Sequence, residues 1–243
     1  NVNLMYTYMP SNYSDSFRMP SILSNGMVQG AIVLNVYDKR IIKQISQLRI
    51  PRVFLDTVPE IDFGELQGDL LLLEGKHTTY LITKSVLDRG LKRIGFVGDI
   101  HYARTNYDRY EGFRQCMEEH GLAVEDKLCL TGKIGIFSYS KEIGDFLDSL
   151  ERLPDAFVCA SDFIAHTLQT YLSEHRERIP EGIVVTGYDG RTEYAVGELI
   201  TTAKVKTGVL GKRLAVQIIY RMEHGDAPYE LTYVNPPIVY RDS

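Results

Sequence analysis

Side chains that could bind a polar molecule directly follow several apolar runs that predict β-strands. Asp189 and Ser161 each follow a run rich in small and β-branched residues, and Glu74 follows four consecutive leucines. In open α/β sheets, ligands bind outside the carboxyl ends of the strands, so these positions are candidates for a binding site. Arg109 adds a guanidinium, which can donate two parallel hydrogen bonds to hydroxyls or to a carboxylate. These residue types favour binding of a small polar ligand.

Catalysis would need a constellation of reactive groups, and none of the common ones occurs in the sequence. There is no G-x-S-x-G motif, no G-x-x-x-x-G-K-[ST] loop and no G-x-G-x-x-G after a predicted strand. The six histidines never lie four residues apart, and the cysteines Cys116, Cys129 and Cys159 form no C-x-x-C pair. We therefore expect no enzyme activity, no metal site and no cofactor.

The hydrophobic pattern alternates short β-branched runs with longer amphipathic stretches, which is typical of βαβ units that build parallel sheets. Strands are predicted at 30–34, 53–55, 70–73, 94–98, near 128, and at 156–160, 183–187 and 201–205. Helices are predicted at 38–48, 76–89, 107–120, 139–152, 163–176 and 208–223. These strands are more numerous than those of one ordinary sheet. An α/β fold with two similar lobes and a ligand cleft between them is the better prediction.

Composition places limits on the partners of the chain. A hydrophobic content of 44% is ordinary for a globular protein with a buried core. The net charge of −5 argues against DNA binding by this chain alone, because a DNA-binding module gains affinity from a basic face. No apolar stretch reaches the roughly 18 residues of a membrane helix. The cysteines are odd in number and form no C-x-x-C pair, so no disulfide framework is expected and a reducing cytoplasm is favoured.

Seven segments resemble, in order, the motifs of the lac repressor and galactose repressor family. The clearest are the R-x-x-G-F motif at 109–113 and the runs P-D-A-F-V-C-A-S-D and P-E-G-I-V-V-T-G-Y-D, which match P-D-A-I-x-x-A-N-D and P-x-D-I-x-V-x-G-x-D. All seven segments lie at 28–34, 50–56, 89–98, 109–113, 154–162, 179–189 and 199–202. Each motif alone is weak, but their shared order covers nearly the whole chain.

The resemblance implies a periplasmic-binding-protein-like fold. One lobe would comprise 1–90 plus 204–222 and the other 91–203 plus 223–243, and residues 1–8 would form the second strand of the family's first lobe. The helix-turn-helix headpiece and the first strand-helix unit of the family would be absent. The sequence also departs from the family, because Glu74-Gly75 stands in place of Asp-Asn and Ser161 in place of Asn.

By this resemblance, Arg109 and Asp189 bind the effector directly. The alternative for Arg109 is an exposed arginine near a helix start. The alternative for Asp189 is a turn aspartate that bonds to its own backbone. Ser161 or Asp162 is expected to cap the following helix, and Ser161 is also a candidate ligand contact.

Three further residues are candidates with strong alternatives. Phe137 matches an aromatic position of the family that packs on a flat ligand face, although it is nearly as well explained as a core residue. Glu74 is either an acceptor for ligand hydroxyls or a solvated carboxylate before a helix. Thr105 matches a contact position in the loop after the strand at 94–98.

The expected function is effector sensing and dimerisation in a bacterial transcriptional repressor. The effector would be a sugar or sugar derivative, and the protein a cytoplasmic homodimer with no membrane contact. Operator DNA would be bound only through the missing headpiece. A periplasmic sugar-binding protein for transport is the first alternative, and a sugar-modifying α/β enzyme is the second.

Overall fold

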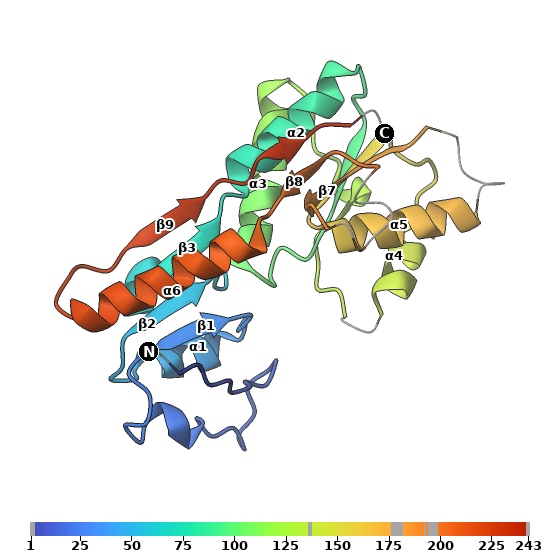
Figure 1. Ribbon diagram of the computed structural model, residues 1–243. Coiled ribbons are helices and arrows are strands. Elements are labelled where there is room, and N and C mark those ends of the chain that lie inside the picture. The colour runs from blue at the N-terminus through green and yellow to red at the C-terminus, as the bar shows by residue number, and fades with distance from the viewer. Residues whose placement is uncertain (1–2, 136–137, 176–181, 192, 194–198, 242–243) are drawn as a thin grey trace. The chain divides into compact units, whose positions relative to one another are not determined.

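The computed structural model describes residues 3–135, 138–175, 182–191, 193 and 199–241. The chain divides into two compact units, one formed by 1–72 with 207–234 and the other by 73–206 with 235–243. Each unit is an α/β sandwich built on mostly parallel strands, which confirms the predicted fold class. Figure 1 shows the elements of both units.

The first unit contains a four-stranded sheet in the order β1-β2-β3-β9. Its strands are β1 (Ala31–Leu34), β2 (Arg52–Leu55), β3 (Asp69–Leu73) and β9 (Leu231–Val234), and β1, β2 and β3 run parallel. Helix α1 (Lys39–Ser46) begins at Asp38, whose carboxylate accepts hydrogen bonds from two backbone N–H groups of its first turn. Helix α6 (Thr207–Glu223) packs against β1 and β2. The apolar faces of α1 and the sheet form the core of this unit.

The second unit contains a six-stranded sheet in the order β10-β8-β7-β6-β4-β5. Its strands are β4 (Ile94–Val97), β5 (Cys129–Leu130), β6 (Ala156–Cys159), β7 (Val184–Asp189), β8 (Thr202–Lys204) and β10 (Ile238–Val239). The edge strand β10 is antiparallel to β8, and its edge position suits the two prolines before it, since proline donates no ladder hydrogen bond. Its helices are α2 (Lys76–Asp88), α3 (Arg104–Glu119), α4 (Tyr139–Asp148) and α5 (Asp162–Glu174).

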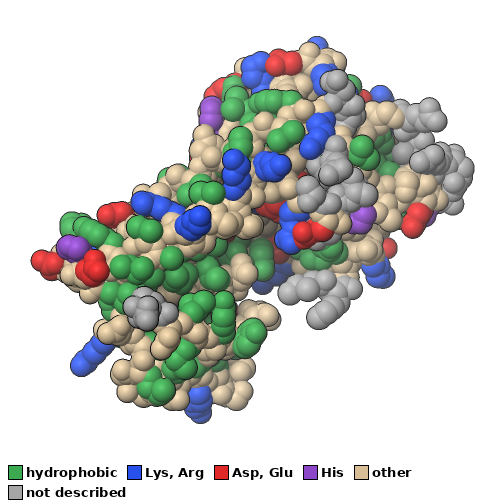
Figure 2. All heavy atoms as spheres, in the orientation of Figure 1, with side chains coloured by type: hydrophobic (Ala, Val, Ile, Leu, Met, Phe, Trp, Pro, Cys, Tyr) green, Lys and Arg blue, Asp and Glu red, His purple; other side chains and the backbone are tan. Residues whose placement is uncertain are grey.

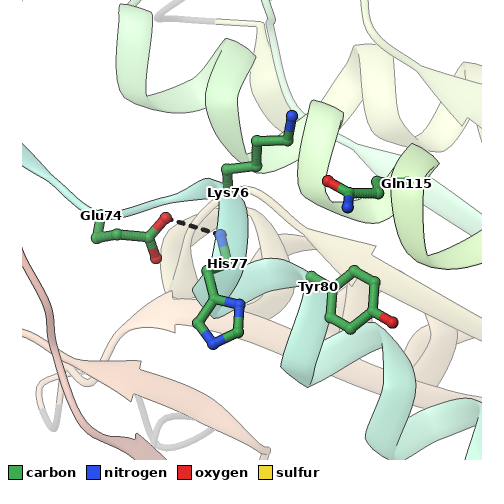
Figure 3. Close-up of a pocket in the computed structure, with 5 residues that line it drawn as sticks. All are labelled: Glu74, Lys76, His77, Tyr80 and Gln115. Atoms are coloured by element: carbon green, nitrogen blue, oxygen red, sulfur yellow. Dashed lines mark hydrogen bonds between the residues drawn. The ribbon is translucent and has the colours of Figure 1, made fainter.

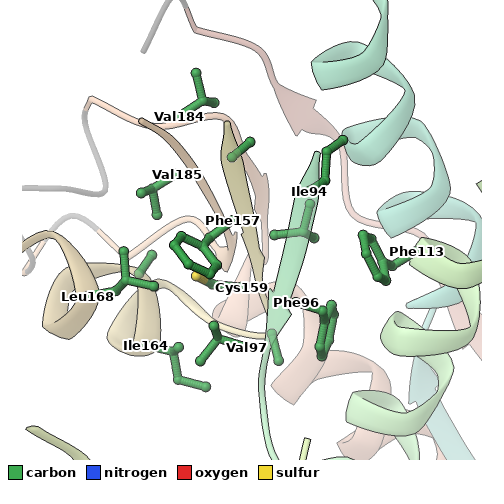
Figure 4. Packing of buried hydrophobic residues seen from close by; sticks show 14 of the residues in the cluster. Ile94, Phe96, Val97, Phe113, Phe157, Cys159, Ile164, Leu168, Val184 and Val185 are labelled. Carbon is green, nitrogen blue, oxygen red and sulfur yellow. The ribbon is translucent and has the colours of Figure 1, made fainter. Parts of the chain in front are cut away.

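Helices cover both faces of the second sheet. Figure 4 shows Phe113 of α3 against one face of β4, and Ile164 and Leu168 of α5 on the other side of the strands. Phe96 and Phe157 are fully buried between these layers. Strands buried on both faces are apolar throughout, which is why β4 and β6 appear in the sequence as continuous hydrophobic runs.

The units differ from the predicted lobes at three boundaries, of which the shift at 204–206 is only three residues long. Helix α2 was assigned to the first lobe, but it packs closely against α3 and lies in the second unit. Residues 223–234 were assigned to the second lobe, but β9 pairs with β3 in the first unit. The two larger differences concern the packing partner of an element, which hydrophobic periodicity alone does not specify.

Residues 3–8 form no strand, contrary to the expectation from the family pattern. Leu4, Tyr6 and Tyr8 in this segment are mostly exposed. A β-strand is stable only when a neighbouring strand pairs with its backbone. The described residues provide no such partner for this segment.

Apolar side chains are also exposed elsewhere on the first unit, where Figure 2 shows many of them gathered on one face. Val209, Val216 and Ile219 lie on α6 at spacings of seven and three residues, which place them along one face of the helix. An exposed apolar surface of this kind is typical of a face that packs against further protein.

Candidate functional site

Arg109 and Tyr188 form the centre of the candidate site in the second unit. Arg109 lies in the second turn of α3, and Tyr188 is the penultimate residue of β7. Both side chains are almost fully buried. The guanidinium carbon of Arg109 lies 3.6 Å from the centroid of the Tyr188 ring, so the cation lies over the aromatic face. Burial raises the pKa of Tyr188 to about 12, while the nearby Arg109 acts in the opposite direction, so the phenol stays protonated.

Only part of the Arg109 guanidinium is paired with the protein. Its Nη1 donates to the carbonyl of Ala160 at 2.5 Å and to the side-chain oxygen of Asn106 at 3.3 Å. Its Nε is buried, yet no described residue accepts a hydrogen bond from it. A buried donor without an acceptor costs about 1–3 kcal/mol, so an unmatched group of this kind calls for an explanation. A ligand that supplies the acceptor would provide it.

Asp189 ends β7 in a strained backbone conformation. Its φ angle is 121°, a region that residues other than glycine rarely occupy, and such strain is concentrated at functional sites. Its backbone carbonyl accepts a hydrogen bond from Val205 at 3.0 Å, but no described residue donates to its carboxylate. The turn-aspartate alternative is thus not supported by the hydrogen bonds of the described residues.

Burial raises the pKa of the Asp189 carboxyl to about 6. The positive charges of Arg109 and Arg191 oppose this rise, and the negative charge of Asp162 reinforces it. Asp189 is therefore largely ionised at pH 7, near a guanidinium whose Nε has no acceptor among the described residues. A carboxylate acceptor beside a guanidinium donor matches a ligand that carries several hydroxyl groups.

Ser161 and Asp162 are both engaged at the start of α5. Ser161 is the N-cap residue, and its hydroxyl accepts a hydrogen bond from Ile164 N at 3.3 Å, as the sequence predicts for one of this pair. The buried Asp162 accepts hydrogen bonds from Thr202 Oγ1 and from the backbone N–H of Arg191, each at 2.7 Å. Asp162 therefore joins α5 to β8 and to the segment after β7.

Glu74 caps helix α2. The N-cap residue Gly75 has no side chain to accept a hydrogen bond, and the Glu74 carboxylate accepts from His77 N at 2.7 Å and Thr78 N at 2.8 Å instead. The Thr78 hydroxyl adds a third bond at 2.7 Å. The Glu74 carboxylate thus already accepts three hydrogen bonds within the protein, which leaves few of its lone pairs for the ligand hydroxyls expected from the sequence.

Glu74 also borders a surface hollow of about 350 Å³. Figure 3 shows Lys76, His77 and Tyr80 of α2 and Gln115 of α3 around it, with the Glu74 carboxylate turned toward the backbone of His77. Arg109, Tyr188 and Asp189 do not line this hollow.

The remaining candidates divide as follows. Thr105 is buried in the first turn of α3, and its carbonyl oxygen would lie 3.0 Å from a Cβ at position 75. Phe137 lies outside the described residues.

The structure brings Arg109 near Asp189 and over the ring of Tyr188. The Tyr188 hydroxyl in turn bonds to the backbone of Glu74. Tyr188 was not singled out from the sequence. The signal that could have found it is its position between the strand predicted at 183–187 and Asp189.

Comparison with known proteins identifies the family. The family model of the periplasmic binding protein-like domain matches residues 83–243. The chain belongs to this family. None of the helices among the described residues is long and apolar enough to cross a membrane.

Curated relatives of this periplasmic binding protein-like domain are transcriptional repressors. The HTH-type transcriptional repressor PurR of Vibrio cholerae is 28% identical over 198 residues, which cover 80% of this chain and 56% of that protein. The PurR of Haemophilus influenzae is also 28% identical, over 68% of this chain and 50% of that protein. The chain therefore spans about half the length of these relatives. The similarity confirms the resemblance to the lac repressor type.

Solved structures show the same fold at low sequence identity. A complex of the transcriptional regulator CelR with cellobiose superposes with a TM-score of 0.77 at 20% identity, covering 89% of this chain and 66% of that one. A LacI family regulator from Enterococcus faecium with bound ribose gives a TM-score of 0.71 at 18% identity, covering 91% of this chain and 81% of that one. At these identities the match supports the fold alone.

Proposed function

We propose that this periplasmic binding protein-like domain is the effector-sensing part of a LacI-type transcriptional repressor. One observation carries the proposal. At the carboxyl end of β7, a buried guanidinium from α3 with an unpaired Nε lies near a carboxylate that receives no hydrogen bond from the described residues. The repressors among the curated relatives support a regulatory role over the transport alternative.

The proposed effector is a small polar molecule of the sugar class. The unpaired N–H of Arg109 matches a hydroxyl or ring oxygen, and the Asp189 carboxylate matches hydroxyl donors. Similar folds have been solved with cellobiose, ribose and D-xylulofuranose bound, which supports this class. Regulation would require a coupling of only about 1–3 kcal/mol between effector and DNA.

The proposed partners follow the same pattern. The protein acts as a cytoplasmic homodimer that binds operator DNA through a headpiece outside this sequence. It has no role as an enzyme in this proposal, because the described residues around Arg109 and Asp189 offer binding groups and no nucleophile beside a base.

A thermal-shift screen against sugars, sugar phosphates and nucleobases tests the proposal. A ligand at 100 times its dissociation constant stabilises a protein by about 2.7 kcal/mol, which raises the melting temperature of a chain of this size by roughly 5–11 °C. Asp189→Ala should remove the shift and Asp145→Ala, an exposed aspartate on α4, should retain it. A hit that survives Asp189→Ala would contradict the assigned site. No hit across the sugars would contradict the ligand class.

A further inference from the structure

The plane of the Arg109 guanidinium is set by the Tyr188 ring. The 3.6 Å between guanidinium carbon and ring centroid is well inside the distance of about 6 Å at which cation–π attraction acts. At this distance a flat guanidinium cannot tilt without meeting the ring. Because the ring is almost fully buried, it does not move aside into solvent.

The Tyr188 ring is itself held at both ends. Its Cα belongs to β7, and its hydroxyl donates a hydrogen bond of 2.7 Å to the backbone carbonyl of Glu74. Glu74 is fixed in turn by the three hydrogen bonds that its carboxylate accepts from the first turn of α2. The orientation of the ring is therefore determined by a strand on one side and a capped helix on the other.

The contacts of Arg109 also determine which nitrogen of the guanidinium lacks a hydrogen-bond partner in the protein. Nη1 is bonded to the carbonyl of Ala160, while the buried Nε has no acceptor among the described residues. We infer that Tyr188 is a positioning residue for effector binding, which holds the Arg109 guanidinium so that its Nε edge faces the ligand. This inference rests on the proposed function and adds a residue that does not itself contact the effector.

The orientation of Arg109 can be measured without a ligand. Protons above an aromatic face are shifted upfield by the ring current, so the Nε–H proton of Arg109 should resonate upfield in a ¹H–¹⁵N spectrum. The signal is assigned by its loss in Arg109→Lys. Tyr188→Phe should keep the upfield shift, because the ring remains, and Tyr188→Leu should abolish it. An Nε–H signal that has no upfield shift in the unsubstituted protein would overturn the stacking role.

The hydroxyl anchor is tested by affinity. D-ribose and cellobiose are the first probes, titrated by calorimetry into the unsubstituted protein and Tyr188→Phe. Loss of one hydrogen bond that positions a binding group should weaken binding by about tenfold. Tyr171→Phe is the matched control, since it removes a hydroxyl bonded to Asp148 on the helices α5 and α4. It should leave affinity unchanged.

The two measurements separate the inference from the proposed function. If neither sugar binds, the ligand class fails, whereas the Nε–H shift still decides whether Tyr188 orients Arg109. If a sugar binds equally well to Tyr188→Phe and to the unsubstituted protein, the hydroxyl anchor is overturned while effector binding stands. If both phenylalanine variants lose affinity equally, the effect is a general loss of packing and the positioning role is also overturned.

Discussion

Arg221 of α6 and Asp69 of β3 form a two-point ion pair in the interior of the first unit. Arg221 Nη2 donates to Asp69 Oδ1 at 2.6 Å and Nε donates to Oδ2 at 3.2 Å, and both side chains are 2% exposed. Gln217 donates a further bond of 2.7 Å to Asp69, and Arg221 also bonds to the carbonyls of Ala227 and Pro228. The pair joins a helix, a strand and the segment that leads to β9.

Arg221→Met should destabilise the first unit strongly. The substitution leaves the Asp69 carboxylate buried without its cation, and breaking a buried pair in this way costs about 3–5 kcal/mol. Lys84→Met is the control, because Lys84 forms an exposed pair with Asp88 on α2, and such pairs contribute roughly 0–1 kcal/mol. Urea unfolding followed by circular dichroism measures both. Similar losses in the two variants would show that the buried pair has no special role.

Gly112→Ala should disturb the packing of α3 against α2. A Cβ at position 112 would lie 1.9 Å from the carbonyl oxygen of Lys76, so the two helices must separate. Overpacking of this kind costs about 1–3 kcal/mol, and the displaced α3 would carry Arg109 away from Tyr188.

The matched control is Gly211→Ala, also within a helix but with no atom within 4 Å of the added Cβ. It should stabilise α6 by roughly 0.5–1 kcal/mol, because alanine favours the helix over glycine. Thermal melts compare the two variants. Gain of stability in Gly112→Ala would contradict the close helix contact.

The strand-end rule located part of the site from the sequence. Asp189 could be placed at the binding edge of a sheet because it follows a predicted strand, whereas Arg109 was found through its resemblance to the R-x-x-G-F motif. The structure brings the two close enough to interact electrostatically. The capping role of Glu74 was harder to foresee, because it depends on the missing side chain of Gly75 and on the path of the chain into α2. The stack of Arg109 on Tyr188 also depends on tertiary packing, which periodicity does not encode.

The buried ion pair was missed for a similar reason. Asp69 directly precedes four leucines, and Arg221 lies in the last turn of an amphipathic helix, where a basic residue is ordinarily explained by the helix dipole. Their contact spans 152 positions of sequence. The sequence shows a charged residue beside each apolar segment, but it does not show that the two side chains contact each other.

Asp189 should make the stability of the second unit depend on pH. Its pKa of about 6 in the folded chain exceeds the value of about 3.9 expected in the unfolded chain. The folded state therefore binds the proton more tightly. The resulting stabilisation is complete below about pH 4 and is lost as the pH rises through about 6.

Asp189→Asn removes this titration while keeping the shape of the side chain. The variant should match the unsubstituted protein near pH 4 and exceed it by roughly 1–3 kcal/mol above pH 7, where the native carboxylate is ionised. Urea unfolding at a series of pH values measures the difference, in which the contributions of other groups largely cancel. A difference that stays constant from pH 4 to pH 8 would contradict the raised pKa.

Effector affinity of the unsubstituted protein should fall below about pH 6, because the protonated carboxyl accepts hydrogen bonds from ligand hydroxyls less well.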